Sequence, residues 1–85
     1  MPNHSEQVAL FNRLNALIKS ASSGFTVETG DYGEVVLQRR GHVRGVWRCH
    51  GGYFAWTPAG YNEPAYKAAG IDAAVAYTQA SILPR

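Results

Sequence analysis

Hydrophobic residues near the start of the chain recur at intervals of three and four, which is the spacing of one face of an α-helix. Polar side chains fill the positions between them, so residues 8–21 are predicted to form an amphipathic helix. Asn3 or Ser5 is suited to cap its start. Ser22, Ser23 and then Gly24 signal its end, with the glycine suited to a left-handed conformation. The apolar face of this helix would consist of Val8, Leu10, Phe11, Leu14, Leu17, Ile18 and Ala21.

After residue 24 the pattern changes to short runs rich in β-branched and aromatic residues, separated by turns that contain glycine. The turns are short and consist of residues 30–33, 41–42 and 51–52. Turns this short join antiparallel neighbours, so the strands should form a meander sheet. The four predicted strands are residues 25–29, 34–39, 43–50 and 53–57.

The glycine pair between the last two predicted strands sets their register. A two-residue turn there pairs Cys49 with Phe54 and Trp47 with Trp56. This register groups three aromatic rings and the thiol on one face of the sheet. We therefore predict that this face is the buried one.

Turn geometry and hydrophobicity disagree at the turn after the second predicted strand. A two-residue turn at Gly41 and His42 would place Arg40 on the core side, whereas a three-residue loop over 40–42 would group apolar residues there. Because burying an unpaired arginine costs several kcal/mol, we predict the three-residue loop. The buried face would then hold Val35, Leu37, Val43, Gly45 and Trp47, and the outer face Val36, Gln38, Arg44, Val46, Arg48, His50 and Tyr53.

The last third of the chain begins irregularly and ends in a second helix. Proline and glycine interrupt residues 58–70, where one helical turn over 63–69 is compatible with the pattern. From residue 71 apolar positions recur at three and four, with Asp72 suited to the first turn and Pro84 to the end. The apolar face is Ile71, Val75, Thr78 and Ile82, with Ala74 beside it. We therefore predict a single α+β domain over residues 1–85 in the order α-β-β-β-β-α, a four-stranded antiparallel meander sheet with two helices packed on one face.

Composition agrees with one small core in a reducing compartment. The chain has 85 residues, 46% of them hydrophobic, which is enough for a single core. Its single cysteine excludes an internal disulfide and favours the cytoplasm. No continuous apolar stretch is long enough to span a membrane, so no membrane association is expected.

Positive charge is concentrated in one segment. The net charge is only +2, yet residues 39–50 include four arginines and two histidines and no acidic residue. Several of these residues are separated by even numbers, so a regular strand would point them to one face. Arginine holds phosphate through paired hydrogen bonds, and a neighbouring tyrosine can stack on a base. The candidate site for an anionic polymer, with single-stranded nucleic acid as the leading ligand, is Arg40, Arg44, Arg48, His50 and Tyr53.

Two other interpretations stay open. The arginines would also suit a solvated sheet face on which they form surface ion pairs with Glu28 or Glu34. The aromatic segment 58–70, together with the exposed sheet face, would suit a protein-interaction or homodimerisation module, or would simply cover one end of the core. The candidate residues for protein interaction are Trp56, Tyr61, Tyr66, Val36 and Val46.

No pattern in the chain supports catalysis or a cofactor. His42, Cys49 and His50 are residue types that bind zinc, but neighbouring residues of a strand point to opposite faces and His42 falls in a turn. Cys49 is expected beside Trp47 in the core, away from any histidine that could act as its base. We therefore predict a non-catalytic binding module with no metal and no cofactor, and we assign the chain to no family.

Overall fold

The computed structural model describes residues 4–21 and 24–83. It confirms an α+β fold with an antiparallel sheet, but the sheet has five strands, so the predicted four-stranded α-β-β-β-β-α order is wrong. The elements are α1 (His4–Ala21), β1 (Phe25–Thr29), β2 (Val35–Arg39), β3 (His42–Cys49), β4 (Phe54–Pro58), β5 (Tyr66–Ala68), α2 (Ile71–Tyr77) and a π-helical turn, η1 (Thr78–Ile82).

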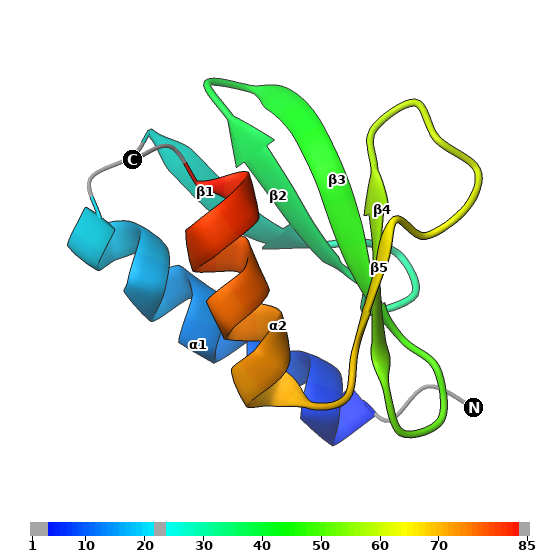
Figure 1. Cartoon of the computed structure of the whole chain (residues 1–85). Helices are drawn as coiled ribbons and strands as arrows, with labels where there is room; N and C mark the ends of the chain where they lie inside the picture. The colour runs from blue at the N-terminus through cyan, green and yellow to red at the C-terminus, as the bar shows by residue number, and fades with distance from the viewer. Residues whose placement is uncertain (1–3, 22–23, 84–85) are drawn as a thin grey trace.

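The strands pair in chain order, β1-β2-β3-β4-β5, and each pair is antiparallel. Figure 1 shows α1 and α2 side by side on one face of this meander. An ion pair between Arg13 Nη1 and Asp72 Oδ1, 3.0 Å apart, joins the two helices at the surface. No helix within residues 4–21 and 24–83 covers the opposite face of the sheet, which we call the outer face (Figure 1).

The fifth strand lies where a helical turn over 63–69 was compatible with the sequence. Tyr66 pairs with Trp56 and Ala68 with Phe54, so both side chains point toward the helices, and Lys67 points outward opposite Ala55. Alternation over three residues is too short to be distinguished from a helical turn by periodicity. Residues 66–68 are a strand because they pair with β4.

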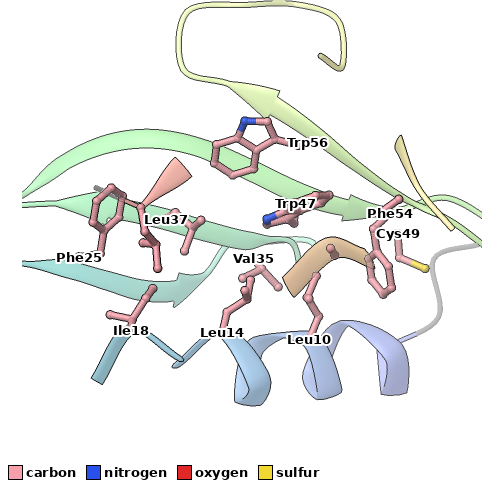
Figure 2. Packing of buried hydrophobic residues seen from close by; sticks show 13 residues of the cluster. Leu10, Leu14, Ile18, Phe25, Val35, Leu37, Trp47, Cys49, Phe54 and Trp56 are labelled. Atoms are coloured by element: carbon pink, nitrogen blue, oxygen red, sulfur yellow. The ribbon is translucent and has the colours of Figure 1, made fainter. Parts of the chain in front are cut away.

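The core is centred on Trp47, which is fully buried between the sheet and the helices (Figure 2). Its ring lies 5.4 Å from that of Trp56, and its indole Nε1–H donates a hydrogen bond to Oγ1 of Thr78 at 3.1 Å. Trp47 pairs with Trp56 and Cys49 with Phe54, which confirms the predicted register around the glycine pair. Helix α1 contributes Leu10, Leu14 and Ile18 to this core.

The β2–β3 hairpin has neither of the two turns considered from the sequence. Arg39 pairs with His42, so the turn has two residues, Arg40 and Gly41, both with positive φ (53° and 84°). The register then shifts at a β-bulge, because Leu37 pairs with Gly45 while the next residue of β2 pairs with the residue at 43. One extra residue in β3 therefore returns the apolar side chains to the core face without a three-residue loop.

The bulge corrects one residue of the predicted core. Val43 was expected on the buried face, but it pairs with Gln38 on the outer face and is 48% exposed. The other predicted members of that face, Val35, Leu37, Gly45 and Trp47, are buried.

The helix ends also differ from the prediction. Helix α1 begins at His4, so Ser5 lies inside it, while Asn3, Ser22, Ser23 and Pro84 lie outside the described residues. Gly24 has a φ of 80°, which confirms its left-handed conformation. At the other end of the chain, α2 continues as η1, and the amide of Leu83 bonds to the carbonyl of Thr78 at 2.9 Å.

Candidate nucleic-acid interface

The outer face carries a row of three paired residues in which two basic side chains flank a small one. Arg48 of β3 pairs with Ala55 of β4, and Ala55 pairs with Lys67 of β5. Arg48 and Lys67 are exposed, whereas Ala55 is only 1% exposed although it faces away from the helices. Neighbouring side chains therefore cover Ala55, and the two cations lie on either side of it.

Two aromatic rings lie next to this row, on the side of the Gly51–Gly52 turn. The amide of His50 donates to the carbonyl of Tyr53 at 2.8 Å across the tight Gly51–Gly52 turn. The rings of His50 and Tyr53 have centroids 5.7 Å apart, and Lys67 Nζ lies 5.5 Å from the centroid of Tyr53. We call the four residues Arg48, His50, Tyr53 and Lys67 the basic corner.

The structure brings together only some of the five residues predicted as a nucleic-acid site. Arg48, His50 and Tyr53 form the basic corner, and Arg44 lies further along β3 at the bulge. Arg40 is not in a strand, because it occupies the β2–β3 turn. At the usual rise of a strand, that turn is about 25 Å from Arg48, at the other end of the hairpin. The even spacing that linked Arg40 to the others is therefore not maintained by a regular strand.

Lys67 is the member of the basic corner that the sequence reasoning missed. It joins the site only because β5 adds to the sheet next to β4. The signal that could have found it is the alternation of Tyr66, Lys67 and Ala68, whose exposure in the structure is intermediate, exposed and buried.

The cations of the outer face have no ion-pair partner among the residues that the structure describes. The ion pair in that part of the chain is Arg13 with Asp72, on the helical side. The two glutamates proposed as partners of the arginines make other contacts: Glu28 Oε2 accepts a hydrogen bond from Gln38 Nε2 at 2.8 Å, and Glu34 Oε1 accepts one from the amide of Tyr32 at 3.2 Å. Arg44, Arg48 and Lys67 thus form no ion pair with those two carboxylates.

The residues proposed for protein interaction do not form one surface. Trp56 is buried in the core, and Tyr66 is half-buried against Tyr77, with stacked rings 4.0 Å apart. Tyr61 is 70% exposed in the loop between β4 and β5. Val36 and Val46 are half-buried opposite each other on the outer face. The aromatic segment is therefore divided between the core and the surface.

The three candidate metal ligands do not converge. His42 begins β3, whereas Cys49 ends it, and Cys49 Sγ lies 3.4 Å from Glu6 Oε2 on the core side. His50 lies on the outer face beside Tyr53. Within residues 4–21 and 24–83, no three His, Cys, Asp or Glu side chains are close enough to hold a metal ion. None of the helices in those ranges is long and apolar enough to cross a membrane.

Comparison of the chain with protein-family models, with curated proteins and with solved structures finds no match. The class of the protein is therefore defined by its own structure, a five-stranded antiparallel meander with both helices on one face.

Proposed function

We propose that the protein is a small binding module that holds single-stranded nucleic acid on the outer face of its sheet. The observation that carries this proposal is the basic corner, in which the Tyr53 ring lies 5.7 Å from the His50 ring and 5.5 Å from Lys67 Nζ. An aromatic ring stacks on a base of any sequence, and the cations beside it hold the neighbouring phosphates.

The geometry suits an unpaired strand better than a duplex. A base that stacks on Tyr53 has to be free of a partner, because its face is inaccessible inside a duplex. Arg48 and Lys67 flank Ala55, two residues along the chain from Tyr53, and Arg44 extends the positive charge along β3. We expect about two to four phosphates to be neutralised, with affinity in the micromolar range or weaker at physiological salt.

Titration of a labelled oligothymidylate about twelve nucleotides long, followed by fluorescence anisotropy, tests the proposal. Affinity should fall between about 20 mM and about 200 mM salt. The double variant Arg48→Ala with Lys67→Ala should weaken binding and lower the slope of log K against log salt by about 1.4, which corresponds to two lost contacts on a single strand. Tyr53→Leu should weaken binding while leaving that slope unchanged, because it removes stacking and no charge.

The matched control is Arg13→Ala with Lys19→Ala. It removes the same charge from exposed residues of α1, on the other side of the molecule, and should leave binding nearly unchanged. No binding at low salt would contradict the proposal. Equal losses in the two double variants would also contradict it, because the attraction would then depend on net charge and not on the basic corner.

Two further statements belong to this proposal. We propose that the module is not catalytic, because the thiol of Cys49 is buried, contacts Glu6 and bonds to no histidine in the part of the chain that the structure describes. We also propose that it acts in the cytoplasm, where a single cysteine stays reduced without a partner.

A second candidate function is homodimerisation through the outer face. The observation in its favour is Val43, which is 48% exposed and continues the apolar pair of Val36 and Val46 on that face. Sedimentation equilibrium would show a dimer of the wild-type chain and a monomer of Val43→Lys. A wild-type chain that stays monomeric at high protein concentration would exclude this candidate.

A further inference from the structure

A cavity of about 610 Å³ opens at the end of the sheet next to the basic corner. It is bordered by the β1–β2 turn, by the end of β3 and by the first turns of α1. Two members of the basic corner, Arg48 and His50, lie in its wall. A strand held on the outer face would therefore pass the mouth of this cavity. The remaining lining residues are Gln7, Tyr32, Glu34, Cys49 and Gly51.

Gln7 presents a hydrogen-bond donor to this cavity. Its side chain is only 4% exposed, which is unusual for a polar residue on a helix. The amide of Cys49 donates to Gln7 Oε1 at 3.4 Å, so the carbonyl oxygen is turned toward the backbone. The Nε2 group is then directed away from that amide, and it donates to no residue that the structure describes. This nitrogen keeps contact with solvent, because it is not among the buried unpaired atoms of the described residues, and it can donate to an acceptor of a ligand that enters the cavity.

Glu34 presents acceptors to the same cavity. One of its oxygens, Oε1, accepts the amide hydrogen of Tyr32 at 3.2 Å, which fixes the carboxylate near the β1–β2 turn. The second oxygen has no partner among the described residues. The cavity thus combines an amide donor from α1 with a carboxylate held at its rim.

We infer that this cavity binds one unpaired guanine base of the strand, an inference that rests on the proposed function. Guanine is the base whose Watson–Crick edge offers two adjacent donors, N1–H and N2–H, beside one acceptor, O6. A carboxylate accepts both donors together, and an amide group donates to the acceptor. Glu34 and Gln7 supply this combination, whereas adenine, cytosine and thymine each offer at most one donor site on that edge.

The size and the rim of the cavity agree with a single base. A volume of about 610 Å³ is in the usual range for sites that hold small ligands. Tyr32 stands at the rim with 84% of its surface exposed, where its ring is free to cover a base that has entered. Arg48 and His50 are placed to hold the phosphates on either side of that base.

The test compares labelled oligothymidylates about twelve nucleotides long that carry one guanine, one adenine or one inosine in the middle. The guanine strand should bind at least about fivefold more tightly than plain oligothymidylate, the lower end of the discrimination that a bidentate base contact provides. Inosine lacks the N2 amino group and should lose most of this gain. Adenine should show none of it.

The decisive variant is Glu34→Gln, which keeps an oxygen for the amide of Tyr32 but replaces the second acceptor by a donor. It should abolish the preference for guanine and leave the affinity for plain oligothymidylate unchanged or slightly higher. The matched control is Glu28→Gln, which makes the same change of charge on the outer face at a residue that does not line the cavity. That control should keep the full preference for guanine.

The outcomes separate this inference from the proposed function. If plain oligothymidylate does not bind at low salt, the proposed function fails and this inference fails with it. If oligothymidylate binds but guanine adds nothing, or if Glu34→Gln and Glu28→Gln behave alike, only the guanine pocket is overturned. Free guanosine monophosphate should bind at least about tenfold more weakly than the guanine strand, because it does not reach the other phosphate contacts. Equal affinities would overturn the inference that the cavity serves a strand.

Discussion

The hydrogen bond between Trp47 and Thr78 is a buried link between the sheet and the C-terminal helix, and Thr78→Val tests its value. Both residues are fully buried, and the indole N–H has the Thr78 hydroxyl as its acceptor at 3.1 Å. Valine keeps the shape of the side chain but offers no acceptor, so the indole N–H would be left without a partner. An unsatisfied buried donor costs about 1–3 kcal/mol.

The other hydrogen bond of this hydroxyl adds little to the expected loss. Thr78 Oγ1 donates to the carbonyl of Ala74 at 2.8 Å, but that carbonyl also accepts the backbone amide of Thr78. It therefore stays satisfied in the variant. The extra methyl group of valine offsets part of the loss, which leaves a net destabilisation of about 1–2 kcal/mol. For a chain of this size the thermal midpoint should fall by about 5–15 °C.

Urea unfolding followed by circular dichroism measures the change, and a double-mutant cycle isolates its cause. In a Trp47→Phe background no indole N–H remains to be left unpaired, so adding Thr78→Val should cost much less than it does in the wild type. Equal costs in the two backgrounds would refute the reasoning, because the effect of Thr78→Val would then not depend on its bond to Trp47.

Three further predictions concern other parts of the molecule. A methyl group at Gly45 would lie 2.6 Å from Trp56 Cζ2, so Gly45→Ala should destabilise the fold by about 2 kcal/mol or more. Gly70→Ser, at a position with no neighbouring atom within 4 Å, should not destabilise it. Equal thermal midpoints for the two variants would contradict this prediction. Cys49 should react with a thiol reagent far more slowly in the native protein than in urea, and similar rates would mean that the thiol is not buried as described. His50→Leu should weaken nucleic-acid binding, because it removes the ring that lies 5.7 Å from the Tyr53 ring in the basic corner; an unchanged affinity in the anisotropy titration would contradict this.

The parts of the fold that were predictable from sequence are those set by strong local signals. The Gly51–Gly52 turn fixed the pairing of Trp47 with Trp56, because two adjacent glycines accept the positive φ values of a tight hairpin. The apolar stripe predicted α1, although Val8 is 42% exposed. The hairpin depends on residues that are close in sequence, and the helix depends on a regular spacing of apolar residues. Both signals can be read directly from the sequence.

The parts that were not predictable depend on partners distant in sequence or on broken regularity. Gln7 is buried because its partner is the backbone of Cys49, 42 residues away, and no pattern near Gln7 signals this. Lys67 reaches the basic corner through a strand of three residues that only its neighbour β4 makes recognisable. A bulge leaves one residue unpaired, and this keeps the apolar residues beyond it on the buried face. Neither turn geometry nor hydrophobic periodicity predicts a bulge by itself.

The bulge in β3 also has a consequence for changes in chain length. Arg44 is the extra residue of the hairpin, so its deletion would leave every remaining pair between β2 and β3 in place, from Arg39 with His42 to Val35 with Trp47. Loss of a residue between Val46 and Cys49, beyond the bulge, would instead shift part of the strand and turn core side chains outward. The hairpin does not need Arg44 for its pairing. A change in chain length is therefore most easily accommodated at Arg44, which is one of the exposed arginines.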